Sequence, residues 1–180
     1  MTVLDARTEH PVRLTLNGRE RCASASPRRL LSDFLRHDLG ATGTHVGCEH
    51  GVCGACQVML DGQVQRGCLT LAVQADGRRV DTIEGLSDTG ELAQLQQAFL
   101  AHNAFQCGYC SSGMLLSALH IVRHHPDADR DAIRDLLSGN YCRCTGYQAI
   151  VDAIESVLRS AAQPASTPIL GASATKRAAP

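Results

Sequence analysis

The chain has 180 residues, which is enough for one domain or two small ones. Its 17 Lys and Arg nearly balance its 18 Asp and Glu, so the net charge of −1 offers no basic footprint for nucleic acid. No apolar stretch approaches the roughly 20 residues that span a membrane, and residues 1–21 alternate polar and apolar instead of resembling a signal peptide. We therefore expect a cytoplasmic protein without a membrane span.

The N-terminal region predicts a β-hairpin followed by a helix. Residues 12–16 alternate polar and apolar, the pair Asn17-Gly18 favours a tight turn, and residues 19–23 can return as the second strand. Residues 28–38 carry leucine and phenylalanine at helical spacing, which gives this segment one apolar face. An amphipathic helix is therefore expected there.

A second hairpin is predicted around Asp61-Gly62. Its strands would cover residues 57–60 and 63–68, and a last strand is expected near residues 79–82. A hairpin, a helix, a hairpin and a final strand outline a β-grasp arrangement. We therefore expect residues 10–85 to form an N-terminal β-grasp domain.

After Gly85 the sequence pattern becomes helical. Apolar residues recur at helical spacing in four segments, which are residues 91–104, 113–124, 129–137 and 147–161. Gly139 is expected to cap the third helix at its C-terminus. Four short helices with short connections predict an antiparallel bundle in a second domain, residues 86–161. Residues 162–180 are rich in Ala, Ser, Thr and Pro and predict a flexible tail.

Eight of the nine cysteines form two groups of four. The first quartet reads C-x4-C-x2-C, with a fourth cysteine after eleven more residues, and consists of Cys48, Cys53, Cys56 and Cys68. Three glycines in the loop 47–56 let the backbone approach the sulfur atoms of a cluster. The backbone N–H groups can then offset the negative charge of those sulfurs. The spacing is the plant-type ferredoxin pattern and predicts a [2Fe–2S] cluster.

The second quartet combines a C-x2-C pair with a C-x-C pair, separated by 31 residues, and consists of Cys107, Cys110, Cys142 and Cys144. Cys110 and Cys144 each precede an apolar-periodic run, so both pairs are expected at helix N-termini. The positive end of a helix favours a thiolate and an anionic cluster. Two clusters in one small chain predict electron transfer.

Other uses of the cysteines stay open at this point. Four cysteines can hold one structural zinc ion, although the C-x-C pair and the eleven-residue gap are not the commonest zinc-ribbon spacings. Disulfides are disfavoured, because a cytosolic chain keeps its thiols reduced. Cys22, the ninth cysteine, lies in a strand-like stretch and is expected to be a buried free thiol.

Three segments carry a family resemblance: Gly47-Cys-Glu-His-Gly-Val-Cys-Gly-Ala-Cys56, Gln106-Cys-Gly-Tyr-Cys110 and Gly139-Asn-Tyr-Cys-Arg-Cys-Thr-Gly-Tyr147. They resemble the small iron–sulfur subunit of molybdenum hydroxylases, the family of xanthine oxidase and aerobic carbon monoxide dehydrogenase. The resemblance covers residues 10–160, and all eight ligand positions match. It does not indicate a substrate.

The resemblance implies an α+β fold, with an N-terminal β-grasp plant-type ferredoxin domain followed by an all-α four-helix-bundle [2Fe–2S] domain. It implies a large partner subunit that carries molybdenum–molybdopterin, as the cytosine dinucleotide, and a medium subunit that carries FAD, or a cytochrome in its place. The complex would be a heterotrimer, alone or dimerised. This chain would hold the two clusters and would contain no substrate pocket and no catalytic acid or base.

The same resemblance assigns roles at the second quartet. A polar residue at Gln106 could simply cap a turn. In the family, the glutamine of the Q-C-G-x-C motif, here Gln106, contacts the pterin, and the last cysteine of the C-R-C motif, here Cys144, lies beside it. His50 lies between two ligands, but four cysteines already fill that site, so a position at the surface or beside the cluster is expected. Arg143 and Tyr109 could contact a partner or simply pack a turn.

Two other function classes remain in view. A free-standing ferredoxin-like carrier would need only one cluster and a strongly acidic docking surface, which the near-zero net charge does not supply. A zinc-stabilised structural module would have no redox role, and visible absorption would distinguish it, because zinc thiolates are colourless there. The leading prediction is the electron-transfer subunit of a molybdenum-dependent oxidoreductase.

Overall fold

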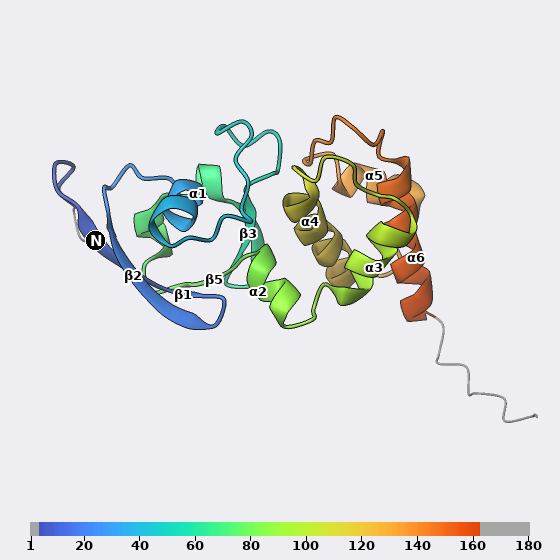
Figure 1. The fold of residues 1–180 in the computed structure, drawn as a ribbon, viewed down its shortest axis with the longest axis horizontal. Helices are drawn as coiled ribbons and strands as arrows, with labels where there is room; N and C mark the ends of the chain where they lie inside the picture. Colours follow the sequence, from blue (N-terminus) through green and yellow to red (C-terminus); the bar gives the residue numbers. More distant parts are fainter. Residues whose placement is uncertain (1–3, 163–180) are drawn as a thin grey trace, which may run out of the picture.

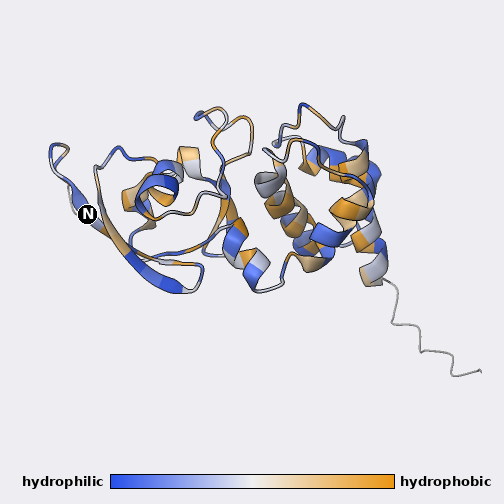
Figure 2. Cartoon of the chain, viewed as in Figure 1, coloured by the Kyte–Doolittle hydropathy of each residue, from blue (hydrophilic) through white to orange (hydrophobic). Residues whose placement is uncertain are grey.

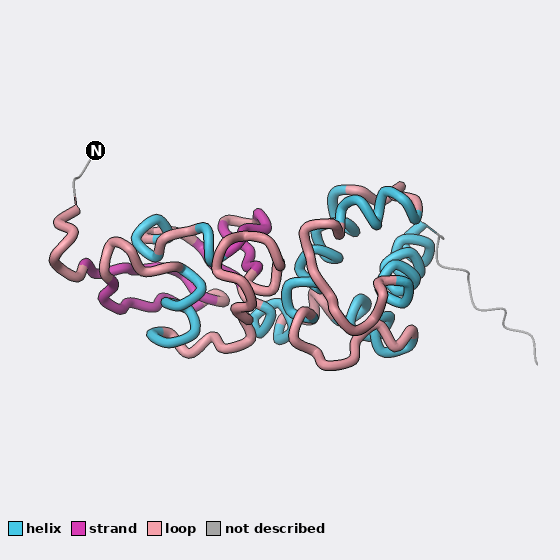
Figure 3. The backbone as a smooth tube through the Cα atoms, turned by 90° about the horizontal axis from the view of Figure 1, so that it is seen from above, coloured by secondary structure: helices cyan, strands magenta, loops and turns pink. Residues whose placement is uncertain are grey.

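The computed structural model describes residues 4–162. Figure 1 shows two bodies side by side, an N-terminal one that contains the sheet and a C-terminal one made of helices. Figure 3, seen from above, shows the strands confined to one end of the molecule. The α+β fold class is therefore confirmed. No helix within residues 4–162 combines the length and the apolar character that crossing a membrane requires.

One mixed sheet is formed by β1 (His10–Leu16), β2 (Arg19–Ala25), β3 (Gln57–Leu60), β4 (Gln63–Arg66) and β5 (Arg79–Asp81). The strand order is β2-β1-β5-β3-β4, with β1 and β5 parallel and the other neighbours antiparallel. Both predicted hairpins are confirmed, because Asn17-Gly18 and Asp61-Gly62 have the positive φ that a two-residue hairpin turn requires.

The first core lies between this sheet and a set of short helical segments. The predicted helix at residues 28–38 starts later than expected, because Leu30 is extended and bridges Leu71. The chain then forms α1 (Leu31–Asp33) and continues as a π-helical segment, η1 (Phe34–Asp38). Their buried side chains and those of the 3-10 helix η3 (Ala72–Ala75) pack on the inward residues of β1, which are Val12, Leu14 and Leu16.

A helix that the sequence did not predict joins the two bodies. It is α2 (Ile83–Asp88), and it contains Gly85, where the domain boundary was expected. Gly85 is required for packing, since a Cβ there would collide with the Asn17 side chain. The Thr82 N–H donates to Asn17 Oδ1 at 2.8 Å, and Asn17 Nδ2 donates to the Thr82 hydroxyl at 3.0 Å. This contact ties the start of α2 to the first hairpin.

Four further helices correspond to the predicted ones: α3 (Ala93–Ala101), α4 (Ser111–His124), α5 (Arg130–Leu136) and α6 (Gln148–Ala162). Their apolar faces (orange in Figure 2) build a second core, centred on Phe99, Met114, Leu116, Ile133 and Ile154. Arg130 holds α5 against α6 through ion pairs with Asp152 and Glu155. Met59 of β3 belongs to this second core, so the sheet and the helices pack directly on each other.

The predicted C-cap at Gly139 is wrong. Helix α5 is capped by Leu137, and Gly139 has no positive φ, which the left-handed cap would need. Its carbonyl instead accepts a hydrogen bond from Arg66 Nη2 of β4 at 3.0 Å. A Cβ at position 139 would approach that nitrogen to 2.5 Å, so the glycine is explained by this close contact between the two bodies.

Candidate iron–sulfur sites

The first quartet lies on the loop between η1 and β3, with its fourth member in the 3-10 helix η2 (Gly67–Leu69). Cys48 and Cys53 are half-buried, whereas Cys56 and Cys68 are buried. The Cys53 N–H donates to Cys48 Sγ at 3.4 Å, and the thiols of Cys56 and Cys68 are hydrogen-bonding neighbours. The fold therefore brings all four side chains to one loop cradle.

Two glycines shape this cradle. A Cβ at Gly47 would lie 3.2 Å from Cys53 Sγ, so a side chain there would crowd the space beside the sulfur. Gly54 has φ +74°, and its Cβ would come within 2.6 Å of the Gly139 carbonyl. The glycines therefore leave room for a cluster on one side and for the second body on the other.

The electrostatics of the first quartet are asymmetric. Burial disfavours the Cys48 thiolate, but N–H groups of Cys53, His50 and Val52 outweigh it and lower the pKa of Cys48 to about 6. Burial, with the adjacent Cys68, raises the pKa of Cys56 to about 12. One thiol thus ionises readily, and another ionises only when a metal displaces its proton.

The second quartet is assembled from two separate loops. Cys110 is the N-cap residue of α4, as predicted, but Cys144 lies four positions before α6, so that pair is not in the first helical turn. The sulfurs of Cys144 and Cys107 are 3.6 Å apart, and the thiols of Cys110 and Cys142 are hydrogen-bonding neighbours. The Tyr147 hydroxyl accepts a hydrogen bond from the Cys142 N–H at 2.9 Å and orders the second loop.

The second quartet repeats the asymmetry of the first. Burial, together with Cys142, raises the pKa of Cys110 to about 12. Burial also acts on Cys142, but the Thr145 hydroxyl, 3.1 Å from Cys142 Sγ, and the N–H groups of Cys144 and Thr145 lower its pKa overall. Each quartet therefore contains one cysteine whose pKa is lowered by hydrogen bonds and one buried cysteine whose pKa is raised, and metal binding must deprotonate the second.

The pairwise arrangement of the sulfurs suits a [2Fe–2S] cluster, in which four thiolates are shared between two irons. Within residues 4–162, no three His, Cys, Asp or Glu side chains converge on one point in the way that a single metal ion requires. The glycine cradle and the N–H groups directed at the sulfurs are the surroundings that such an anionic cluster needs. The residues present thus fit two binuclear clusters.

The two quartets meet where the two bodies touch. The Tyr141 N–H donates to the Cys53 carbonyl at 2.9 Å, which joins a first-quartet cysteine to the residue before Cys142. Tyr109 adds a second connection, because its hydroxyl donates to the Val46 carbonyl at 2.7 Å. A cavity of about 150 Å³ between them is lined by cysteines of both quartets, namely Cys53, Cys107, Cys110, Cys142 and Cys144.

Two domain families match the chain. The 2Fe-2S iron-sulfur cluster binding domain matches residues 14–86, and the [2Fe-2S] binding domain matches residues 82–155. The small subunit of nicotine 6-hydroxylase from Paenarthrobacter nicotinovorans is 50% identical over 139 residues, which are 77% of this chain and 84% of that subunit. The chain belongs to the iron–sulfur subunits of the molybdenum hydroxylases.

Other proteins that are similar to this chain support the family assignment. Caffeine dehydrogenase subunit gamma from Pseudomonas sp. (strain CBB1) is 50% identical over 153 residues, covering 83% of this chain and 92% of that subunit. In the crystal structure of quinoline 2-oxidoreductase from Pseudomonas putida 86, the matching chain has a TM-score of 0.79 and 47% identity, with 85% of this chain and 96% of that chain covered.

Membership in this family decides between the function classes. The chain is the iron–sulfur component of a multi-subunit molybdenum-dependent oxidoreductase, and its role is electron transfer. A free-standing carrier is not favoured, because relatives that match over most of their length are subunits of larger enzymes. A zinc module is not favoured either, because both matching domain families bind [2Fe–2S] clusters.

The remaining singled-out residues lie at different places. Gln106 is exposed beside Cys107, and no hydrogen bond of its side chain is found within residues 4–162. His50 is exposed, as expected, and contacts the Cys48 carbonyl through Nδ1. Tyr109 packs against the first body and stacks on His45, with ring centroids 4.9 Å apart. Arg143 is exposed.

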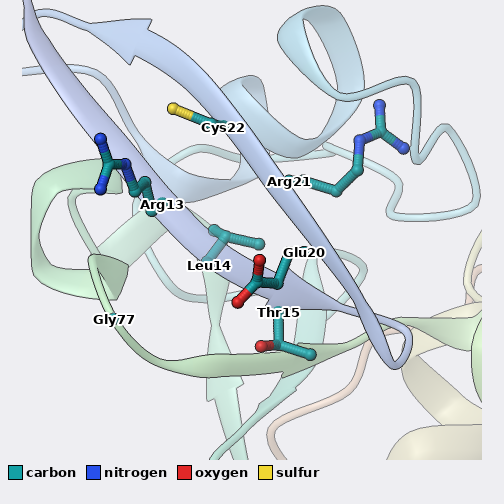
Figure 4. Close-up of a pocket in the computed structure, with 7 residues that line it drawn as sticks. All are labelled: Arg13, Leu14, Thr15, Glu20, Arg21, Cys22 and Gly77. Carbon is teal, nitrogen blue, oxygen red and sulfur yellow. The ribbon is translucent and has the colours of Figure 1, made fainter.

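Cys22 corrects one prediction. It was expected to be buried, but it is exposed on β2, one of the two edge strands of the sheet. Strand alternation explains this, because Cys22 pairs with Arg13 on the outward face of the hairpin, opposite the buried face of β1. Figure 4 shows it beside an open cavity of about 530 Å³, on the hairpin that carries neither quartet.

A buried polar cluster was missed by sequence reasoning. The Ser117 hydroxyl lies 2.7 Å from Gln57 Oε1 and 2.8 Å from Asn140 Oδ1, and Asn140 Nδ2 donates to Gln57 Oε1 at 3.2 Å. The cluster links β3, α4 and the loop before Cys142. A serine within an apolar helical run was its one signal in the sequence.

Proposed function

We propose that this chain relays single electrons from a molybdopterin-containing large subunit, through the second quartet and then the first, to FAD on a medium subunit or to a cytochrome. When bound, the two [2Fe–2S] clusters would each carry one electron at a time. The observation that carries the relay is the Tyr141–Cys53 hydrogen bond, which joins the two ligand loops where the bodies meet. The order, from the second quartet to the first, is what the family resemblance implies. A short bonded route between the sites supports a relay rather than two independent stores.

The ligand assignment is part of this proposal. Cys48, Cys53, Cys56 and Cys68 would hold one cluster, and Cys107, Cys110, Cys142 and Cys144 would hold the other. The chain's own contribution is to desolvate the sulfurs unequally and to direct N–H groups at them, which sets the potentials. In both quartets the donors come from the cysteine's own loop: N–H groups of residues 50–53 act on Cys48, and Thr145 and Cys144 act on Cys142.

The inlet is proposed at the exposed side of the second quartet. Gln106 and Cys144 are both exposed, and an amide that can donate and accept suits the polar edge of a pterin. The pterin would be molybdopterin cytosine dinucleotide in the large subunit. Aldehyde oxidoreductase from Desulfovibrio gigas supports a large partner, because this chain matches only 17% of that much longer polypeptide, at 41% identity and a TM-score of 0.75.

The outlet is proposed at the first quartet. Val52 and Leu69 are 40% and 64% exposed and rim the loop that carries Cys48, so they offer an apolar docking surface. The complex would be a cytoplasmic heterotrimer, alone or dimerised. Residues 10–85 and 86–161 would act as separate domains, the second an antiparallel four-helix bundle. The predicted tail at 162–180 falls outside the described residues, apart from Ala162 at the end of α6.

Purification of the intact complex tests the function. It should contain about four iron and four acid-labile sulfide per copy of this chain, and two distinct electron paramagnetic resonance signals after reduction. Nitrogen heterocycles form the first substrate panel, since nicotine, caffeine and quinoline name the relatives' enzymes, and aldehydes form the second. Two zinc ions per chain without labile sulfide, or clusters that no molybdenum subunit can reduce, would overturn the proposal.

A further inference from the structure

Tyr109 lies between the C-x2-C cysteines of the second quartet and reaches across to the first body. The turn that carries it contains Gly108, whose φ is +81°. A Cβ added at Gly108 would meet no atom of residues 4–162 within 4 Å, so the backbone conformation alone calls for glycine. The Tyr109 hydroxyl donates to the Val46 carbonyl at 2.7 Å, two residues before Cys48. One side chain thus connects the loops of the two quartets.

His45 of the first body holds the same tyrosine in two ways. The two rings are stacked, with their centroids 4.9 Å apart and their planes 17° from parallel. His45 Nδ1 also lies 2.8 Å from the Tyr109 carbonyl oxygen, and because a carbonyl can only accept, Nδ1 carries the proton. The Ser112 hydroxyl, in the first turn of α4, lies 3.4 Å from the same nitrogen. Residues 45 and 46 therefore contact Tyr109 at its ring, its hydroxyl and its backbone.

These contacts lie beside cysteines of both quartets. Tyr109 lines the cavity of about 150 Å³ that the quartets share. A Cβ added at Gly47 would lie 3.2 Å from Cys53 Sγ and 3.8 Å from Tyr109 Cε1, so the tyrosine ring is close to a sulfur of the first quartet. Along the chain, Tyr109 directly precedes Cys110 of the second quartet. The stacked pair therefore stands next to proposed ligands of both sites.

The two bodies do not depend on this stacked pair to stay together. Elsewhere between them, Met59 of β3 packs into the second core, and Gly113 of α4 fits against the Gly54 carbonyl. Tyr109, by contrast, is 51% exposed, so it removes little apolar surface from water. Loss of its side chain should therefore loosen the ligand loop without separating the bodies.

We propose that Tyr109 and His45 are positioning residues for electron transfer between the two quartets. The inference rests on the two clusters of the proposed function, and the step is the transfer of one electron between the sites, with no bond formed or broken. A functional group keeps a productive geometry when supporting side chains are themselves locked by packing and hydrogen bonds. Here the stacked pair fixes the spacing between loop 107–110 and loop 48–56, and electron transfer slows steeply as that spacing grows.

The test uses the full chain with both clusters loaded and reduced. Each reduced cluster splits the electron paramagnetic resonance signal of the other, and this splitting reports their spacing. Tyr109→Ala removes the ring and the hydroxyl, so the splitting should become smaller and less sharp, and electron transfer between the clusters should slow severalfold. Leu100→Ala, which shortens a side chain that is 63% exposed on α3, is the matched control and should change neither.

Conservative variants guard against a folding artefact in Tyr109→Ala. Tyr109→Phe loses only the hydroxyl bond, and His45→Phe loses only the Nδ1 donor, so each keeps a ring in the stack and should change the splitting less than Tyr109→Ala does. The double variant loses both hydrogen bonds and should change it more than either single variant. If the double variant keeps the splitting and the transfer rate of the parent, the positioning role is overturned.

Iron content and thermal unfolding separate this inference from the proposed function. The conservative variants should hold about four iron per chain, as the parent should, and should melt within a few degrees of it. A parent chain without iron overturns the proposed function, whereas iron-loaded variants that behave like Leu100→Ala overturn only the role of the stacked pair. The spacing acts in either direction of electron flow, so a reversed cluster order leaves the inference intact.

Discussion

The two cysteine quartets are brought together by opposite routes. In the first, three of four cysteines lie within nine residues of one loop, 48–56, and the N–H groups that act on Cys48 come from the same loop. In the second, two pairs 31 residues apart must be brought together by the packing of α4 and α6. The comparison teaches that a cluster site can be encoded locally or depend on the folded core.

The largest expected effect separates the two sites by removing one proposed ligand from each. Cys48→Ser and Cys110→Ser should each lower the iron content of the chain from about four to about two. With substrate, the Cys48→Ser complex should still reduce the second cluster, whereas the Cys110→Ser complex should leave the first cluster oxidised. Stopped-flow absorption and electron paramagnetic resonance measure both steps. The same blocked step in both variants would mean that the proposed cluster order is wrong.

A smaller effect is expected where the two sites touch. Gly113 of α4 faces the Gly54 carbonyl, and an added Cβ would collide with it. Ala is normally the better helix residue by about 1 kcal/mol. Here Gly113→Ala should instead destabilise the chain by roughly 1–3 kcal/mol and broaden the spectra of both clusters. Thermal unfolding of the loaded chain measures this, with Ser111→Ala in the same helix as the control. A rise in melting temperature would contradict the contact.

The buried polar cluster should matter for the second site more than for the first. Ser117→Ala leaves Gln57 and Asn140 without their shared partner, which should cost roughly 1–3 kcal/mol of unfolding free energy. Asn140 lies two residues before Cys142, so the spectrum of the second cluster should change while that of the first does not. Ser160→Ala, at an exposed position of α6, is the matched control and should stay within about 0.5 kcal/mol. If Ser117→Ala and Ser160→Ala lost equal amounts of unfolding free energy, the buried hydrogen bonds of Ser117 would not matter for stability.

The smallest effect on the chain itself is expected at the proposed inlet. Gln106 is exposed and no cysteine ligand is lost in Gln106→Leu, so both clusters and the melting temperature should be unchanged. Assembly with the large subunit should weaken by roughly 1–3 kcal/mol, which is about tenfold or more in affinity, or electron entry should slow. Gln65→Leu, an exposed glutamine on β4, controls for the loss of a surface amide. If Gln106→Leu assembled and turned over like the parent, Gln106 would be a turn residue without a role at the inlet.

Much of the fold was predictable because its signals are local. Asn17-Gly18 and Asp61-Gly62 require positive φ, and the two hairpins follow from that requirement. Apolar spacing located α3, α4, α5 and α6 to within a few residues. The failures have tertiary causes: Leu30 is held extended by Leu71, and Gly139 is needed by Arg66 rather than by a helix cap.

The sequence by itself determined the chemistry, since eight cysteines in two spacings, with glycines beside them, identify the metal centre through covalent reach and backbone freedom. Only the tertiary structure decided how the two centres communicate and what surrounds them. The Tyr141–Cys53 hydrogen bond and the buried contacts among Gln57, Ser117 and Asn140 each join residues far apart in the chain. Such contacts follow from packing two cores against each other, and no local pattern of residues specifies that packing.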